Sequence, residues 1–414
     1  MRASWPRSGS ATSGWSTRHG KEHTIGTEET ASTGRLAHRV DRVALFGAVL
    51  AFAGLVGLPF VEFRANRIAS GVPEAISVAG PVGWLACLIA VAALAAAVVA
   101  PRVHRGPVLV GIAVALIVTV AAALGVAAVV LQEGEPPFAR VSIGAGAWLA
   151  IVGAAVVWFA GWRADTGRGL RWLAVVSAFG GLLAIGVWGG LGELSIAKEY
   201  VAQSRRFWPL VGQHLVLAGS GIGFGMLIGI PLGVAASRNR VARDIGIGVV
   251  AIIQTIPSMA MLGLLIAPLA ALGLRGIGTT PAIVALTLYA LLPIVRNTFV
   301  GLTGVDSAAL DAGRGMGMGA GRLFLGVEVP LALPLVFEGI RAAAVLVIGI
   351  AAVTAFIGAG GLGVLVFQGW GQQADDLTLL GAVPMVVLAV AADSLMRALG
   401  RAVVSPGIRE EAAA

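Results

Sequence analysis

The sequence predicts an all-α protein that crosses a membrane many times, and three observations support this prediction. Of 414 residues, 57% are hydrophobic and 12% are charged, whereas soluble domains carry about 25% charged residues. Long apolar runs recur along the chain, and each is long enough for a helix to cross a bilayer core of about 30 Å. The runs do not alternate with a period of two, so the strands of a membrane barrel are excluded. The composition also excludes a water-soluble enzyme.

The charge and the cysteine content exclude two further classes of protein. The net charge is +8, but the basic residues are scattered singly between apolar runs, which indicates cytoplasmic loops and no nucleic-acid partner. Cys87 is the single cysteine. No internal disulfide and no cysteine-based metal site can therefore form, and we expect no metal site elsewhere.

The apolar runs begin only after a long polar stretch. Residues 1–40 are rich in Ser, Thr, Gly, Arg and His, and we expect a disordered cytoplasmic tail there. A signal peptide is disfavoured because the first apolar run begins at Val43 and is too long. Ten spans are expected, at 43–61, 78–100, 107–131, 143–162, 172–191, 214–237, 245–272, 280–299, 335–357 and 377–399.

The distribution of charge orients these spans in the membrane. With ten crossings, most of the 29 Lys and Arg residues fall on the side of the N-terminus. The positive-inside rule then places both termini in the cytoplasm, in a multi-pass protein of the cell membrane. Residues 403–414 are expected to form a second cytoplasmic tail.

The chain divides into a plain half and a half that carries motifs. The first five spans, within 41–191, are rich in Ala and Val, and we interpret them as a membrane extension with no residues that suggest catalysis or transport. In 192–213, charged and apolar residues alternate, which predicts an amphipathic helix on the external surface. The remaining spans, 214–402, form the candidate core, with a long cytoplasmic loop at 301–334.

The first core span carries a face of small residues. Glycines recur every fourth residue, at Gly221, Gly225, Gly229 and Gly233. Such a face allows another helix to approach closely in lipid. We therefore predict a helix-packing role for these residues.

The second core span is interrupted by polar residues and a proline. Gln254, Thr255, Pro257 and Ser258 lie in the middle of an otherwise apolar run. Interrupted helices of this kind line transport sites, which would place these side chains on a translocation path. The alternative is that Ser and Thr repair a proline kink by bonding the freed carbonyls. The sequence leaves both interpretations open.

The loop 301–334 is neither apolar enough to span nor charged enough to be a loose linker. Asp306 can cap a short helix through Ala312. The glycines that follow would end this helix and let a partner approach, and they are Gly313, Gly315, Gly317, Gly319 and Gly321. A phosphate-binding loop is excluded, because it requires a lysine and the only lysines are Lys21 and Lys198.

Two isolated polar features have structural interpretations. Asp393 and Arg397 are spaced to pair on one helix face, and we favour an ion pair over a proton relay. His214 falls at the edge of a span and is expected at the membrane interface. An intramembrane enzyme would need a His cluster or paired carboxylates, which the spans lack.

The loop resembles a known family. Asp311, Ala312 and Gly313, then Gly317 four residues later and Pro330, reproduce the spacing of the cytoplasmic EAA loop in permease subunits of bacterial ABC importers. Asp311 stands where the pattern has Glu, and Gly313 where it has Ala, which preserves charge and small size. The resemblance extends to the importers of glycine betaine, choline and related osmoprotectants, through the segments 253–258, 291–298, 312–318 and 356–363.

The resemblance covers about 207–402 and implies both a fold and a set of partners. It implies a binding-protein-dependent (MetI-like) permease core in which the loop helix, with Arg314, docks on an ABC ATP-binding subunit. That subunit would bind ATP, so this chain would have no cofactor and no catalytic residue. The other implied partners are an extracytoplasmic solute-binding protein and a second permease, identical or related.

The expected function is import of a small osmoprotectant by alternating access. Tyr289 and Asn297 join the polar residues of the second core span as candidates for the translocation path. The alternative is an ion-coupled secondary transporter, which would need an acidic group in mid-membrane. Apart from Asp393, we find no acidic residue in mid-membrane.

Overall fold

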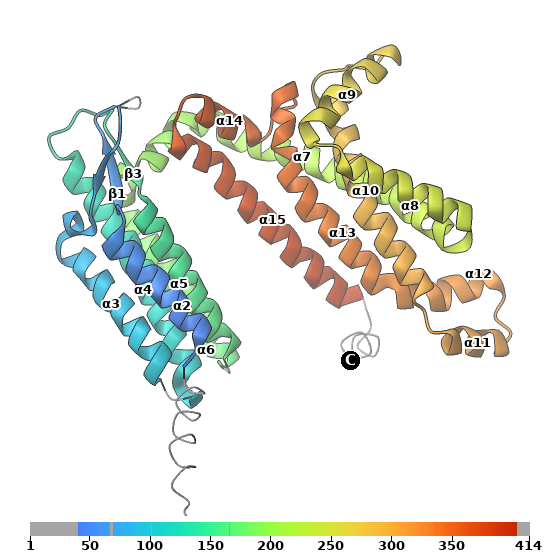
Figure 1. Ribbon diagram of the computed structural model, residues 1–414, viewed down its shortest axis with the longest axis horizontal. Helices are drawn as coiled ribbons and strands as arrows, with labels where there is room; N and C mark the ends of the chain where they lie inside the picture. The colour runs from blue at the N-terminus through green and yellow to red at the C-terminus, as the bar shows by residue number, and fades with distance from the viewer. Residues whose placement is uncertain (1–39, 67–68, 101, 165, 404–414) are drawn as a thin grey trace, which may run out of the picture.

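A computed structural model of the chain describes residues 40–66, 69–100, 102–164 and 166–403. The tails expected at 1–40 and 403–414 lie outside the described residues, except for residues 40 and 403. The molecule consists of two helical bundles joined at one end (Figure 1). The expectation of an all-α polytopic membrane protein is confirmed, with one small sheet added.

The N-terminal bundle, here called the extension, contains long apolar helices. Asp41 begins the first helix, because its Oδ1 accepts hydrogen bonds from the backbone N–H groups of Val43 and Ala44. The helices are α2 (Arg42–Gly57), α3 (Gly80–Val99), α4 (Arg102–Gln132), α5 (Ala145–Arg163) and α6 (Arg168–Trp188), with the 3-10 turns η1 (Ile76–Ala79) and η2 (Gly190–Glu193).

A three-stranded antiparallel sheet covers one end of the extension, and the sequence did not predict it. Its strands are β1 (Val61–Arg64), β2 (Val72–Glu74) and β3 (Arg140–Ile143), in the order β2-β1-β3. Glu62 pairs with Pro73 on one side and with Ser142 on the other. Strands of three or four residues are too short for alternation to be read from sequence.

The extension and the core share one long helix, α7 (Ser195–Arg238), of 44 residues. The amphipathic segment 192–213 is thus largely the first part of the same helix that forms the first core span, and not a separate surface helix. His214, which the sequence placed at the edge of a span, lies in the interior of the core bundle. Its side chain is fully buried, and its Nε2 lies 3.1 Å from the carbonyl oxygen of Ile348.

The core continues with broken and unbroken helices. They are α8 (Arg240–Thr255), α9 (Ser258–Ala271), α10 (Thr279–Thr303), α11 (Ser307–Gly315), α12 (Ala320–Leu323), the π-helical turn η3 (Phe324–Glu328), α13 (Val329–Ala351), the 3-10 turn η4 (Val353–Ile357), α14 (Gly363–Gly371) and α15 (Asp375–Val403). The sheet and α14 lie at one end of the molecule, and α11 and α12 lie at the other (Figure 1).

The number of spans differs from the ten expected. Within the described residues, eight helices are long and apolar enough to cross a membrane, or nine if α8 and α9 count as one. Those two helices meet at an angle of 111°, so the run 245–272 is not one straight span. The first expected span, 43–61, is a helix of 16 residues followed by a strand, because Pro59 cannot continue the helix.

Each bundle has its own buried core. In the extension, buried alanines line the helix contacts, and Leu55, Phe60 and Leu116 fill the space beside the sheet. In the core, α7, α10 and α13 pack around Leu286 and Ile294. Near the C-terminal end of α15, Asp393 and Arg397 pair at 2.7 Å, as the sequence predicted. Arg341 of α13 also contacts Asp393.

Candidate functional site

The short helix α11 has a defined beginning. The Oδ1 atom of Asp306 accepts a hydrogen bond of 2.9 Å from the backbone N–H of Ala308. This cap satisfies one of the free N–H groups at the start of the helix. The helix predicted from Asp306 through Ala312 is therefore confirmed, and it runs three residues further, to Gly315.

The end of α11 is fixed by glycine. The N–H of Met318 bonds to the carbonyl of Gly313, and the N–H of Gly317 bonds to the carbonyl of Arg314. This pair of bonds is the Schellman motif, which needs a left-handed residue just after the helix. Gly317 fills that place with φ +77°, which a residue with a side chain adopts only at a cost.

The two faces of α11 differ in burial. Gly313 is buried, and a Cβ atom there would lie 2.5 Å from the Cδ1 methyl carbon of Leu323, so α11 approaches α12 closely at this glycine. On the other side, Asp311 and Arg314 form an ion pair of 2.7 Å between two exposed side chains. Met316 is 71% exposed. The outer face of α11 thus offers both charges and an apolar side chain to a partner.

An ion pair that the sequence did not predict ties this segment to α7. Arg238, at the end of α7, contacts the carboxylate of Glu328, and its guanidinium lies 5.3 Å from the ring centroid of Phe324. Glu328 is 6% exposed. One signal was present in the sequence, because Glu328 is an acid within an apolar run. Its partner lies 90 residues away, and no spacing rule connects the two.

Pro330 lies in the first turn of α13, directly after the π-helical turn. Proline has no N–H to donate to the carbonyl four residues earlier, so a regular α-helical bond is missing at this place. The helix from Ala320 to Ala351 passes through this irregular turn. From Ala320 on, the segment 301–334 is therefore helical and continuous with the next span.

The broken helix lies against α10 through two reciprocal hydrogen bonds. Gln254 Nε2 donates to the carbonyl oxygen of Tyr289 at 3.0 Å, and Tyr289 Oη donates to the carbonyl oxygen of Ile256 at 2.5 Å. The Ile256 carbonyl is freed by the break, so a tyrosine on a neighbouring helix satisfies it. The structure thus brings Gln254 and Tyr289 together.

The other candidate path residues are not gathered into one cluster. Thr255 is exposed, and its hydroxyl donates to the carbonyl of Ile252, as the kink-repair interpretation expects. Pro257 and Ser258 form the corner between α8 and α9. Asn297 lies further along α10, where its amide donates to the carbonyl of Pro293 and its side chain packs against Gly339.

The glycine face of α7 lies against α10. A Cβ atom at Gly221 would lie 2.6 Å from Leu286, and one at Gly225 would lie 2.6 Å from Ala290. Gly229 and Gly233 face Ile294 and Thr298 in the same way. The contact residues on α10 also recur every fourth position, so the two helices approach along a continuous seam.

Two family comparisons divide the chain where the structure does. The family described as binding-protein-dependent transport system inner membrane component matches residues 221–405. The N-terminal domain of ABC transporter permease YehY matches residues 39–197. With eight apolar helices among the described residues, the chain is a multi-pass membrane protein of the ABC permease class.

Individual relatives narrow the class. The chain is 41% identical over 198 residues to the carnitine transport permease protein OpuCB of Listeria monocytogenes, covering 48% of this chain and 88% of the relative. It is 42% identical over 200 residues to the osmoprotectant import permease protein OsmW of Salmonella typhimurium, covering 48% and 93%. The chain belongs to the family of osmoprotectant permeases of ABC importers. A solved chain of the inward-facing MetNI methionine ABC transporter aligns with 49% of it, at 26% identity and TM-score 0.43.

Proposed function

We propose that this chain is the transmembrane subunit of an ATP-driven importer for a small osmoprotectant such as glycine betaine, choline or a similar quaternary amine. Relatives that share about two fifths of their residues with the core carry the names of carnitine, choline and glycine betaine permeases. The core alternates between outward and inward access, and the chain binds neither ATP nor a metal.

The geometry of α11 is the observation that supports this proposal most directly. The helix is capped at both ends, so its shape is fixed before any partner arrives. Its outer face, with Asp311, Arg314 and Met316, is exposed. A rigid exposed helix is suited to docking in a groove of an ATP-binding subunit.

The path from α11 into the membrane supports the same proposal. α11 packs on α12, and the helix from Ala320 runs on into α13. The ion pair between Glu328 and Arg238 joins this helix to α7, which packs along α10. A displacement of α11 is therefore transmitted to three core helices, α13, α7 and α10.

The proposal includes further partners and an orientation. A second permease, identical or related, completes the pore, and an extracytoplasmic solute-binding protein delivers the solute. Both termini lie in the cytoplasm, so α11 faces the cytoplasm and the sheet faces outward. Gln254, Thr255, Pro257, Ser258, Tyr289 and Asn297 remain our candidates for the translocation path.

Uptake into proteoliposomes tests the proposal. The chain is reconstituted with its ATP-binding subunit and solute-binding protein, and radiolabelled glycine betaine uptake is measured with ATP inside or outside the vesicles. We expect uptake only with hydrolysable ATP on the α11 side. Uptake by this chain alone, driven by a proton or sodium gradient, would show a secondary transporter instead.

A substitution separates docking from folding in the same assay. Ala312 is exposed on α11, so Ala312→Arg adds bulk and charge to the outer face without strain in the helix. We expect uptake to be lost with an unchanged thermal midpoint, whereas Ala312→Ser retains uptake. Full uptake by Ala312→Arg would show that α11 does not dock.

A further inference from the structure

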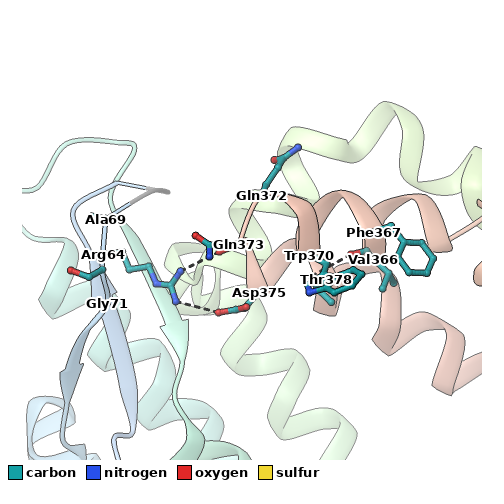
Figure 2. Close-up of a pocket in the computed structure, with 11 residues that line it drawn as sticks. Arg64, Ala69, Gly71, Val366, Phe367, Trp370, Gln372, Gln373, Asp375 and Thr378 are labelled. Carbon is teal, nitrogen blue, oxygen red and sulfur yellow. Dashed lines mark hydrogen bonds and ion pairs between the residues drawn. The ribbon is translucent and has the colours of Figure 1, made fainter. Parts of the chain in front are cut away.

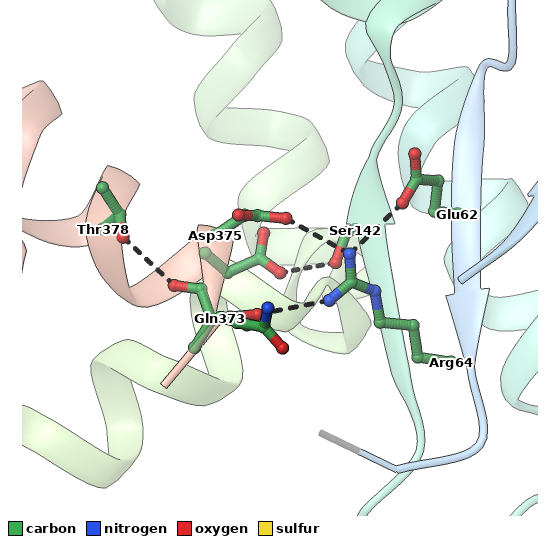
Figure 3. Close-up of polar contacts among 8 residues, drawn as sticks. Glu62, Arg64, Ser142, Gln373, Asp375 and Thr378 are labelled. Atoms are coloured by element: carbon green, nitrogen blue, oxygen red, sulfur yellow. Dashed lines mark hydrogen bonds and ion pairs between the residues drawn. The ribbon is translucent and has the colours of Figure 1, made fainter. Parts of the chain in front are cut away.

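The extension meets the core at the end that carries the sheet, and the two bundles diverge toward the other end (Figure 1). At the joined end, a cavity of about 740 Å³ is lined by Arg64 of β1 and by Asp375 at the start of α15 (Figure 2). Arg64 Nη2 lies 3.2 Å from Asp375 Oδ2 and 3.4 Å from Glu62 Oε2 (Figure 3). Two carboxylates therefore neutralise this guanidinium, so it joins the two bundles and is not available to a ligand.

An arginine at the opposite end of the extension has no such partner. Arg171 lies near the start of α6, where its Nη2 donates a hydrogen bond of 3.1 Å to the carbonyl oxygen of Trp162. Its guanidinium lies 5.3 Å from the ring centroid of Trp162, and that ring stacks on Trp158 at 6.0 Å. In the described part of the chain, no carboxylate forms an ion pair with Arg171. These contacts fix the position of the guanidinium and leave its charge uncompensated.

A groove of about 360 Å³ lies beside this arginine. Its lining residues are Trp162, Arg171, Trp172 and Val175, of which only Arg171 is charged. Arg171 Nη1 makes no hydrogen bond among the described residues and, unlike Nε, is not a buried atom without a partner. A ligand in the groove can therefore bond to Nη1 without displacing an existing partner.

The rest of the lining is apolar, and it continues along α6. Trp172 and Val175 are followed at helical spacing by Phe179 and Leu183, and all four side chains are exposed. No charged residue follows Arg171 in α6. The helix thus offers one positive charge at its start and a long apolar surface after it. A dissolved anion would gain nothing from that surface, whereas a phospholipid carries both a phosphate and acyl chains.

The charges near the groove favour a lipid with a net negative charge. Residues 163–171 contain three arginines and one aspartate. Arg163, at the end of α5, is exposed and lies over the ring of Phe159, with 5.6 Å between its guanidinium carbon and the ring centroid. Basic clusters beside a membrane helix attract anionic head groups. No carboxylate lines the groove, so the ammonium group of a zwitterionic lipid would find no ion-pair partner in it.

We propose that this groove binds one anionic phospholipid, with its phosphate at Arg171 and an acyl chain along Trp172, Val175 and Phe179. Arginine suits this role because its terminal nitrogens donate charge-assisted hydrogen bonds to phosphate oxygens. The site uses residues of α5 and α6 alone and does not depend on the proposed import activity. The extension thereby carries a lipid site at the end that is not joined to the core.

Lipid retention by the purified full chain tests the site. The chain is delipidated in detergent and supplied with equal amounts of phosphatidylglycerol and phosphatidylcholine, and native mass spectrometry counts the lipids that stay bound. We expect one retained phosphatidylglycerol per chain, with about a fivefold preference over phosphatidylcholine, because the unpaired arginine favours the negative lipid. Equal retention of the two lipids, or retention of neither, would overturn the proposal.

A competition distinguishes a lipid from a dissolved anion. Excess inorganic phosphate should leave the retained phosphatidylglycerol in place, because inorganic phosphate gains nothing from the apolar walls. Displacement of the lipid by inorganic phosphate would show that the groove is a site for a dissolved anion, which would contradict the proposal.

A pair of tryptophan variants tests the position of the site. Val175→Trp fills the groove and leaves Arg171 in place, so we expect retention of phosphatidylglycerol to fall by about tenfold. Leu173→Trp is the matched control, because Leu173 is an exposed apolar residue of the same helix that does not line the groove. Equal retention by the two variants would contradict the assigned position.

A second pair of variants tests the phosphate contact. Arg171→Gln removes the charge, and we expect the preference for phosphatidylglycerol over phosphatidylcholine to disappear. Arg275→Gln removes the same charge from an exposed position between α9 and α10 and should keep the preference. If Arg171→Gln kept the fivefold preference, the phosphate would not lie at Arg171.

The oligomeric state tests the other occupant of an apolar groove, a second copy of the chain. We expect mass photometry to give the same oligomeric state for Val175→Trp and Leu173→Trp. If Val175→Trp alone dissociated an oligomer, the groove would be a contact between chains and the lipid assignment would be wrong.

Discussion

The extension and the core both pack helices through glycine, but in different ways. In the extension, a Cβ atom at Gly54 of α2 would lie 2.5 Å from the backbone oxygen of Gly146 in α5, so the two helices touch backbone to backbone. In the core, Gly229 of α7 faces the side chain of Ile294 on α10, and a Cβ atom there would lie 3.0 Å from the Cγ2 methyl carbon. Backbone contacts cannot adjust, whereas the ends of side chains can.

The two bundles also differ in the regularity of their helices. Within the described residues, the extension contains no span that is bent at a break, while the core has the 111° corner between α8 and α9 and a π-helical turn before α13. Irregular helices of this kind are common at sites that move or bind. The comparison indicates a rigid extension attached to a core that can change shape.

The largest expected effect tests the rigidity of the extension. Gly54→Ala should destabilise the protein by about 2 to 3 kcal/mol, because the methyl group meets a backbone oxygen that cannot move aside. The thermal unfolding midpoint of the purified protein measures this. Gly57→Ala, whose Cβ atom is free of contacts, should leave the midpoint unchanged. Equal midpoints for the two variants would contradict the rigid backbone contact between α2 and α5.

The second effect concerns the ion pair that joins the core loop to α7. Arg238→Ala leaves the buried Glu328 carboxylate without its partner. Because Arg238 is 53% exposed, we expect a loss of roughly 1 to 2 kcal/mol rather than the full cost for a buried pair. The rate of ATP-driven uptake should fall by more than this loss of stability can explain.

A double variant is the control for this pair. In Arg238→Ala with Glu328→Gln, the unpaired charge is gone, so the thermal midpoint should recover while uptake stays low. Recovery of both the thermal midpoint and uptake would mean that the ion pair stabilises the fold but does not transmit motion from α11 to α7.

A smaller effect concerns the end of α11. Gly317→Val forces a branched side chain into a left-handed conformation and should cost about 1 to 2 kcal/mol locally. Uptake should fall as α11 loses its fixed end, whereas Gly317→Asn, which tolerates this conformation, should retain it. Gly315→Val, at an open helical position, controls for size, and an equal loss of uptake there would contradict the role assigned to Gly317.

The smallest effect tests the adjustable seam of the core. Gly229→Ala brings a methyl group to 3.0 Å from the Cγ2 atom of Ile294, a contact with a side chain that is less tight than the one at Gly54, so we expect a cost below about 1 kcal/mol. Gly223→Ala points away from any neighbour and should be neutral. If the thermal midpoint of Gly229→Ala fell as far as that of Gly54→Ala, the two bundles would be equally rigid.

Much of the fold could be predicted because membrane helices leave strong local signals. Long apolar runs defined most spans, and Asp306 with the glycines after it defined α11. The glycine period of α7 indicated a packing face. These features depend on residues that are close in the sequence.

The rest depends on contacts between distant residues. Nothing local connects Arg238 to Glu328 or Arg64 to Asp375, so both ion pairs escaped prediction. Pro257 indicated a break, but the 111° angle also depends on Tyr289 bonding the freed carbonyl of Ile256. The burial of His214 likewise depends on the position of α13, from which Ile348 contributes its carbonyl.

Cross-linking at α11 tests the central claim most directly. Cys87 is buried, so with Cys87→Ser the variant Ala312→Cys carries a single exposed thiol. We predict that this thiol reacts only from the cytoplasmic side and cross-links to the ATP-binding subunit, with loss of glycine betaine uptake. A thiol that reacts from outside intact cells, or a cross-linked transporter that still imports, would contradict the account.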